Sequence, residues 1–332
     1  MNIQLPVLPA IIAVLIALSS CTKGRQIKDE GNLVPKTVEY DAMLPFIFVN
    51  GTRLHAEAFG PADSSLLVVL HGGPGNDYRY LLNCKAFAGQ GYRVVFFDQR
   101  GSGLSERHLK STYTTQQLYD DLAGVIAHYR TSSAQKVFLL GHSWGGMLAT
   151  GYINKYPAQI NGAVLLEPGG FIWQDVLDYI KRSGNVSITS EMINDMLYAE
   201  QFITGKETEH AILDYKYALL LAADGNRDSP EGDEAKTPFW RAGAVANHAL
   251  FDLGEQEKPD WTTNLHHYTT KVLFAYSEKN KAYGYDYAKK VSSAYPNVQL
   301  LKVNGAGHNM ISFPTGWNNF YPVALSYLNS LK

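Results

Sequence analysis

The chain has little cysteine and no excess of basic charge. Only Cys21 and Cys84 occur among its 332 residues, which excludes a disulfide scaffold and a multi-cysteine zinc site. Lys plus Arg number 29 and Asp plus Glu number 31, giving a formal net charge of −2. Nucleic acid is therefore not an expected partner. Apolar residues make up 45% of the chain, a globular balance that excludes wholesale disorder.

The first residues form an apolar run that ends in small residues and a cysteine. The stretch from Ile3 to Leu18 is shorter than the roughly 20 residues that span a bilayer, and its length is typical of a signal peptide. The following Ser19-Ser20-Cys21 resembles a bacterial lipoprotein box. The resemblance implies a signal peptide over residues 1–20, acylation of Cys21, a tether over residues 21–43 and lipid anchoring to a membrane of the bacterial cell envelope. The alternative is an ordinary secretory signal on a secreted or periplasmic protein.

Short apolar runs alternate with segments of helical length in the remaining chain. Such runs are typical of strands buried on both faces of a parallel sheet, and they lie at 66–70, 93–97, 137–140, 163–166, 272–275 and 298–303. Helices are expected at 114–130 and 147–157, and a hairpin at 46–60 that turns at Asn50-Gly51. The alternation predicts an α/β fold with a mostly parallel sheet.

The alternation stops between about residues 170 and 268. That stretch is rich in helix formers and aromatic residues and has no clear buried strand. We therefore expect a core in two parts, 44–169 and 269–332, with an inserted helical cap over 170–268.

A nucleophile motif follows the predicted strand 137–140. The residues Gly141-His142-Ser143-Trp144-Gly145 match the G-x-S-x-G elbow, in which a sharp strand-to-helix turn exposes a serine hydroxyl. The glycines are needed because this turn leaves no room for Cβ atoms. The alternative is a glycine-rich helix start with Ser143 as its cap.

A second glycine-rich segment follows the strand 66–70. It reads His71-Gly72-Gly73-Pro74-Gly75, and glycines at such a turn let the backbone approach a substrate closely. We expect the backbone N–H groups of Gly73 and Trp144 to form an oxyanion hole.

Three motifs in this order resemble the proline iminopeptidase branch of the α/β-hydrolases. They are HGGPG at 71–75, DQRGSGLS at 98–105 and GHSWGG at 141–146. The resemblance implies an α/β-hydrolase fold and a serine hydrolase that acts on short peptides. Asp98 and Arg100 are expected to be structural.

The catalytic base should be a histidine after the last strand. Gly305-Ala306-Gly307-His308 follows the strand 298–303, and its glycines permit a tight loop that turns the imidazole towards Ser143. We therefore assign the base to His308.

The acid of the triad is missing from the position that most relatives use. There the acid ends the turn after the strand 272–276, and in this chain that residue is Asn280. A neutral amide cannot stabilise an imidazolium, and loss of this charge costs on the order of 10⁴ in rate in a well-studied serine protease. Three hypotheses are open: Glu278 is the acid, the protein is catalytically impaired, or the acid lies elsewhere.

We favour Glu167 as a relocated acid. It ends the apolar run 163–166, in the strand directly after the nucleophile helix, so it should reach the same edge of the sheet as Ser143. The chain order Ser143, Glu167, His308 also keeps the order that α/β-hydrolases use. Glu278 is the second candidate.

The expected activity is that of a serine hydrolase working through an acyl-enzyme. The leading substrate is a short peptide with an N-terminal proline or another apolar residue; the alternatives are small apolar esters or lactones, or a non-catalytic binding lipoprotein. Glu191, Glu200 and Asp214 of the cap could hold the substrate's amino group, although a solvated helix face is the more expected place for each of them taken singly. No metal, organic cofactor or obligate protein partner is implied.

Overall fold

The computed structural model describes residues 33–184, 207–223 and 230–332. The predictions for the signal peptide, for acylation of Cys21 and for the first part of the tether lie outside these residues. The same is true of Glu191 and Glu200. Within the described ranges, no helix is both long and apolar enough to cross a membrane.

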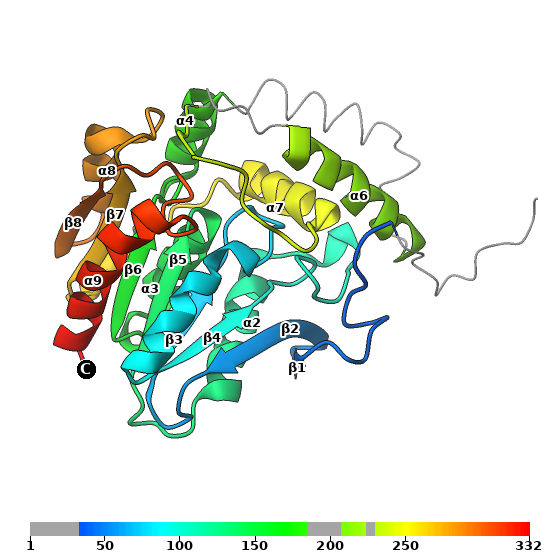
Figure 1. Ribbon diagram of the computed structural model, residues 1–332, viewed down its shortest axis with the longest axis horizontal. Coiled ribbons are helices and arrows are strands. Elements are labelled where there is room, and N and C mark those ends of the chain that lie inside the picture. Colours follow the sequence, from blue (N-terminus) through cyan, green and yellow to red (C-terminus); the bar gives the residue numbers. More distant parts are fainter. Residues whose placement is uncertain (1–32, 185–206, 224–229) are drawn as a thin grey trace, which may run out of the picture.

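An eight-stranded sheet forms the centre of the molecule (Figure 1). Its order is β1-β2-β4-β3-β5-β6-β7-β8, and all neighbours from β4 onward are parallel. The strands are β1 (Phe46–Val49), β2 (Thr52–Phe59), β3 (Ser65–Leu70), β4 (Tyr92–Phe97), β5 (Val137–His142), β6 (Gly162–Leu166), β7 (Val272–Ser277) and β8 (Val298–Val303). The predicted fold class, the six predicted strands and the hairpin at Asn50-Gly51 are confirmed.

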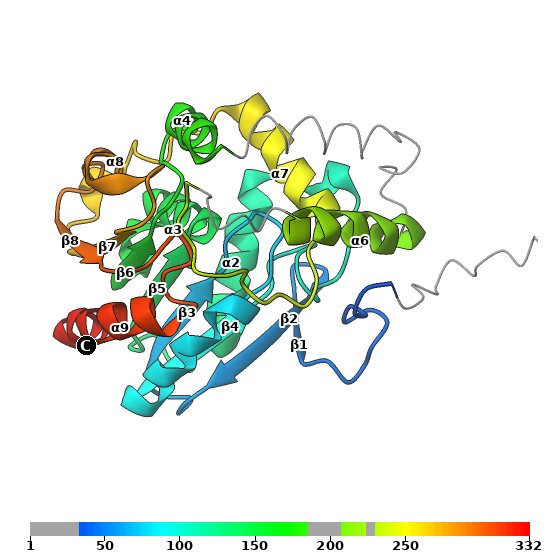
Figure 2. The same ribbon diagram turned by 45° about the horizontal axis from the view of Figure 1, so that its top comes forward.

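Side chains of each central strand point alternately into two apolar layers. In β3, Leu66, Val68 and Leu70 belong to one cluster, whereas Leu67 and Val69 belong to the other. Both layers are covered by helices (Figures 1 and 2), which explains why these strands are apolar along their whole length. One layer packs under α2 (Thr115–Tyr129), α3 (Trp144–Lys155) and α8 (Gly284–Ser292), the other under η1 (Arg79–Gln90) and α9 (Pro314–Ser330).

Local signals set the ends of several helices. The Thr114 hydroxyl accepts a hydrogen bond from the Gln117 N–H at 3.0 Å and so caps α2. Gly91 ends η1 in the left-handed conformation at φ 77°. Pro314 opens α9, where its missing N–H costs nothing. Three further single-turn helices are η2 (Lys110–Thr112), η3 (Pro157–Gln159) and η5 (Leu265–His267).

Among the described residues, three α-helices lie between β6 and β7 in the chain: α4 (Trp173–Ser183), α6 (Glu207–Ala223) and α7 (Ala244–Glu257). We call them the inserted helices. Figures 1 and 2 show them together at one end of the sheet. The Gly243 N–H donates to the Gly75 carbonyl at 2.7 Å, and Asn247 Nδ2 donates to the Pro74 carbonyl at 2.7 Å. The start of α7 therefore lies against the loop that follows β3.

Candidate active site

The loops that follow five parallel strands meet at one edge of the sheet. They follow β3, β5, β6, β7 and β8, and they carry the residues predicted to act. The register of the ladder aligns these ends directly, because His142 pairs with Leu166 in β6 and Leu166 pairs with Ala275 in β7. Open α/β sheets bind their ligands at this edge, outside the carboxyl ends of the strands.

Ser143 occupies a strained turn between β5 and α3. Its backbone has φ 53° and ψ −120°, a conformation that costs a non-glycine residue about 1–3 kcal/mol. Its N–H donates to the Leu166 carbonyl at 2.8 Å. The flanking glycines permit the turn, since a Cβ on Gly141 would lie 2.4 Å from the Gly145 carbonyl oxygen. This is the geometry that the elbow motif predicts.

The glycine-rich loop after β3 lies directly against this turn. A Cβ on Gly72 would be 3.1 Å from the Ser143 Cβ, and Gly73 has φ 120°. Within the described parts of the chain, the N–H groups of Gly73 and Trp144 donate no hydrogen bond. Two such donors beside a nucleophile are what an oxyanion hole requires.

Gln99 joins the loop after β3 to the start of α3. Its side-chain carbonyl accepts from the Trp144 indole N–H at 2.9 Å, and its amide group donates to the His71 carbonyl at 2.9 Å. Its backbone N–H donates to His71 Nε2 at 3.0 Å. The loop after β3 and the start of α3 are therefore joined through one buried side chain.

His308 and Glu167 form a buried ion pair. His308 Nδ1 lies 2.8 Å from Glu167 Oε2, and both residues are buried. A carboxylate at Nδ1 holds the imidazole in the tautomer that leaves Nε2 free to accept a proton. The structure thus brings together the two residues that the strand-end argument selected.

Three further hydrogen bonds fix the Glu167 carboxylate. Oε1 accepts from the Ser277 N–H and from the Ser277 hydroxyl, both at 2.7 Å. Oε2 also accepts from Asn280 Nδ2 at 2.8 Å. The Asn280 oxygen in turn accepts backbone N–H groups from Ala282 and Tyr283. Asn280 therefore supports the carboxylate at 167, and a second carboxylate in its place would repel the first.

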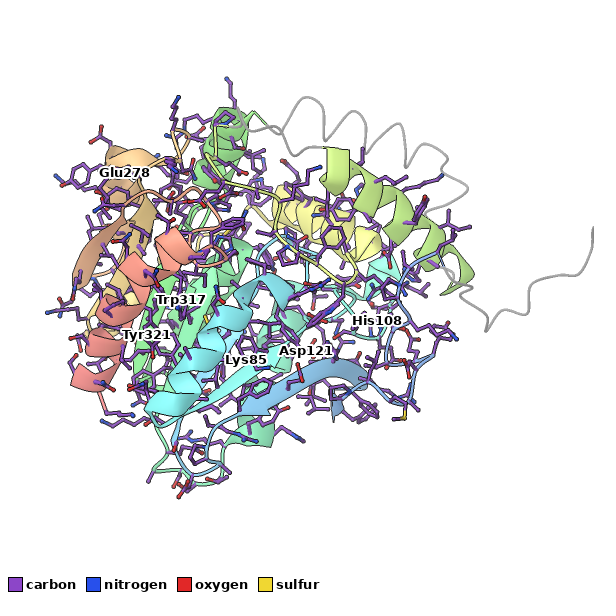
Figure 3. All side chains as sticks on the ribbon, viewed as in Figure 1. Lys85, His108, Asp121, Glu278, Trp317 and Tyr321 are labelled. Carbon is purple, nitrogen blue, oxygen red and sulfur yellow. The ribbon has the colours of Figure 1, made fainter. Side chains whose placement is uncertain are left out.

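Glu278 lies away from the histidine. Its carboxylate accepts from Lys302 Nζ at 2.7 Å and from the Gly305 N–H at 2.9 Å. The side chain is exposed, and Figure 3 shows it on the side of the molecule formed by α8 and β8. The structure does not bring the second candidate acid to His308.

His142 links the histidine loop to the glycine-rich loop. Its Nε2 donates to the His308 carbonyl at 2.9 Å, and its Nδ1 accepts from the Tyr80 hydroxyl at 2.8 Å. The Tyr80 oxygen accepts the Gly72 N–H at 2.7 Å. Burial and the charge of His308 hold the pKa of His142 well below its usual range. Tyr80 was not predicted, because nothing in its sequence neighbourhood marks a residue whose partners lie in two other loops.

The protonation of His308 is set by opposing effects. Burial lowers the pKa of the imidazole, but the hydrogen bond to Glu167 and the charges of Glu231, Glu167 and Asp233 outweigh burial. Together they raise the pKa to about 9. The surrounding carboxylates therefore favour the protonated imidazole, and they would stabilise the imidazolium that forms when His308 takes up a proton.

The two charged residues of the DQRGSGLS segment contact the scaffold. Arg100 makes a two-point ion pair with Asp121 at 2.7 and 2.9 Å. Asp98 accepts the N–H groups of Tyr78 and Leu104 and pairs with the His55 ring at 2.8 Å. These contacts agree with the structural roles expected for both.

Asp214 is not placed to bind a substrate's amino group. It is fully buried between Arg107, at 3.0 Å, and Arg241, at 2.7 Å. Burial raises its pKa, but the two guanidinium groups outweigh burial and lower the pKa below its usual value. Both expectations for Asp214, a binding residue or a solvated one, are therefore wrong, because sequence alone does not show that two arginines from other segments neutralise it.

Known proteins share this architecture. The proline iminopeptidase-related protein of Thermus thermophilus superimposes with a TM-score of 0.59 over 87% of this chain and 97% of its own, at 22% identity. The family model for serine aminopeptidases (S33) matches residues 62–219. The chain has the α/β-hydrolase fold.

The chain is also similar in sequence to curated hydrolases. It is 28% identical to a proline iminopeptidase of Pestalotiopsis fici over 277 residues, covering 81% of this chain and 94% of the relative. It is 38% identical to epoxide hydrolase B of Mycobacterium tuberculosis over 117 residues, only 34% of this chain and 32% of that relative. The resemblance to the proline iminopeptidase branch thus extends beyond the three motifs.

Proposed function

We propose that this α/β-hydrolase is a serine hydrolase that cleaves short peptides after an N-terminal proline or another apolar residue. The observation that carries the proposal is the 2.8 Å contact between Glu167 and His308. The histidine loop is joined to the strained elbow, because His142, the residue before Ser143, donates to the His308 carbonyl at 2.9 Å. A histidine oriented by a buried carboxylate can activate a neighbouring hydroxyl.

The reaction proceeds in two halves. Ser143 Oγ attacks the carbonyl carbon while its proton passes to His308 Nε2, and Glu167 stabilises the resulting imidazolium. The N–H groups of Gly73 and Trp144 stabilise the oxyanion. The C–N bond then breaks, and the leaving amine takes the proton from His308. Water, deprotonated by His308, attacks the acyl-enzyme, and Ser143 recovers its proton as the acid product leaves.

Peptides are favoured as substrates by the comparisons. The relative that is matched over nearly its whole length carries the name proline iminopeptidase, and the matching family model is described as serine aminopeptidase. Small esters and lactones are the alternative, since the same nucleophile and oxyanion hole serve both.

Three substrates separate these activities. Prolyl-naphthylamide, its amine-blocked form and p-nitrophenyl acetate are compared on one preparation, with Ser143→Ala as the control. An aminopeptidase cleaves the free-amine substrate and loses activity when the amine is blocked. Cleavage of the ester alone would make the protein an esterase or lactonase. Equal cleavage of the free and the blocked amide would make it an amidase that does not require a free amino group. No cleavage of any of them by a folded sample would favour the binding lipoprotein.

We also propose that the enzyme is anchored to the cell envelope through acylated Cys21. The support is the lipoprotein-like segment that ends at this residue. Expression with radiolabelled palmitate tests it: the wild type should incorporate label and partition into detergent, and Cys21→Ala should do neither. An unlabelled wild type that is cleaved and released would point to the secretory alternative.

A further inference from the structure

The Tyr179 hydroxyl contacts three polar side chains, and one of them is His308. It lies 3.3 Å from His308 Nδ1, on the side where Glu167 binds, and 3.3 Å from Glu231 Oε1. Asn280 Nδ2 donates to it at 3.3 Å. Because a tyrosine hydroxyl has one proton, it donates to the carboxylate and accepts from the two N–H groups. The His308 Nδ1 proton thus faces Glu167 directly and Glu231 through one hydroxyl.

Glu231 belongs to a segment that is bonded to the histidine loop. The Glu231 carbonyl accepts the His308 N–H at 2.9 Å, and Asp233 Oδ1 accepts the Asn309 N–H at 2.7 Å. Packing is close, since a Cβ on Gly307 would lie 2.3 Å from the backbone carbon of Gly232. The segment 230–233 is therefore held at a fixed position relative to the imidazole.

The same segment is bonded to the loop that supports Glu167. The Pro230 carbonyl accepts the Lys281 N–H at 2.8 Å, and a Cβ on Gly232 would lie 2.4 Å from the Lys279 carbonyl oxygen. Tyr179 itself comes from α4 and is buried. Both Tyr179 and Glu231 thus come from the chain between β6 and β7, whereas Glu167, Asn280 and His308 come from the loops after β6, β7 and β8.

We propose that Glu231 is a second carboxylate of the catalytic base. It acts through the Tyr179 hydroxyl as a positioning residue that favours protonated His308 and couples the base to the inserted helices. This inference rests on the proposed serine-hydrolase function. It assigns to Glu231 a role that neither the triad nor the motifs require.

In the part of the chain that the structure describes, the charged groups that face the His308 imidazole are all carboxylates, and the other titratable groups that face it are neutral. Glu167 faces it from the end of β6, and Glu231 and Asp233 face it from the segment before α7. The Tyr179 hydroxyl faces it from α4. His142 faces it from the end of β5, with ring centroids 4.6 Å apart, and is held neutral by burial. Removing one carboxylate should therefore make the His308 imidazole less basic.

The test measures the His308 pKa by NMR titration of its Cε1–H signal, assigned by its loss in His308→Gln. Glu231→Gln should lower this pKa by about 1 unit, the effect typical of removing one nearby charge. Glu278→Gln is the matched control, because it removes an exposed carboxylate that contacts Lys302, and it should leave the value unchanged. Glu231→Asp keeps the charge and should recover part of the shift.

Tyr179→Phe is an independent test, because it removes the hydroxyl and keeps the Glu231 carboxylate. It should shift the pKa in the same direction. Adding Glu231→Gln to it should shift the value further, but by less than Glu231→Gln does in the wild type, because the attraction through space remains while the part carried by the hydroxyl is already lost. The midpoint of the acid limb of kcat/KM on p-nitrophenyl acetate should follow the NMR values.

An unchanged His308 pKa in folded Glu231→Gln would overturn the proposal, and so would full additivity with Tyr179→Phe. If Glu231→Gln does not fold, an unchanged pKa in Tyr179→Phe would overturn it. The NMR readout needs no turnover, so a wild type that hydrolyses nothing would reject the proposed function and leave this measurement decisive.

Discussion

Replacing Glu167 by Gln should abolish most activity while keeping the shape of the site. Glu167 Oε1 faces two donors from Ser277, and Oε2 faces one donor each from Asn280 and His308. A glutamine has one oxygen and one NH₂ group. Whichever way its amide is turned, the NH₂ group faces two donors and leaves that side without an acceptor.

The orientation that keeps the Ser277 contacts disables the base. The NH₂ group then faces His308 Nδ1 and favours the tautomer with the proton on Nε2, which cannot accept the proton of Ser143. Loss of the carboxylate also removes the charge that stabilises the imidazolium. Together these effects should lower kcat by about 10⁴, which corresponds to about 5.4 kcal/mol in the activation free energy.

The assay is kcat and KM on p-nitrophenyl acetate at several pH values, with the circular dichroism spectrum and Tm as controls for folding. Glu278→Gln is the matched variant and should retain wild-type kcat, since its side chain is exposed and binds Lys302. Near-full activity in a folded Glu167→Gln enzyme would refute the assignment of the acid.

Three further outcomes are expected. kcat/KM should rise with pH up to about 9, because the raised pKa of His308 keeps the base protonated below that value and only the neutral form accepts a proton; a plateau already reached at pH 6 would contradict this. Asn280→Asp, which places a second carboxylate against Glu167, should reduce activity at neutral pH by about tenfold or more, whereas unchanged or higher activity would mean that position 280 accepts the acid. Gly145→Ala should lower the free energy of unfolding, measured in urea, by about 3 kcal/mol or more, because the added Cβ would lie 2.1 Å from the Leu70 carbonyl oxygen. An unchanged free energy of unfolding would show that the turn at Ser143 has room for a Cβ.

The sheet and the main pairing at its edge were predictable because their signals are local. Each buried strand is an apolar run closed by glycine or a polar residue, and the carboxyl ends of parallel strands meet at one edge. That rule and the order nucleophile, acid, histidine of the α/β-hydrolases selected Glu167 and His308, although 141 residues separate them. The resemblance to that family identified Asn280 as unusual without showing what it does.

The parts that were missed depend on contacts between distant segments. Tyr179 and Glu231 reach His308 only after the chain between β6 and β7 has packed on the core, and no periodicity marks them. Asp214 was expected to be solvated or to bind substrate, because a carboxylate in sequence has no visible partner, whereas in the fold two arginines enclose it. Burial and pairing of charge are tertiary properties, so sequence patterns do not report them.

The central claim is that Ser143 is an activated nucleophile, and labelling with a fluorophosphonate probe tests it most directly. The intact protein should react, with the adduct located by mass spectrometry on the peptide that contains Ser143. Folded Ser143→Ala should not react, and Glu278→Gln should react like the wild type. A folded wild type that stays unlabelled, or a Ser143→Ala variant labelled equally well, would contradict the account.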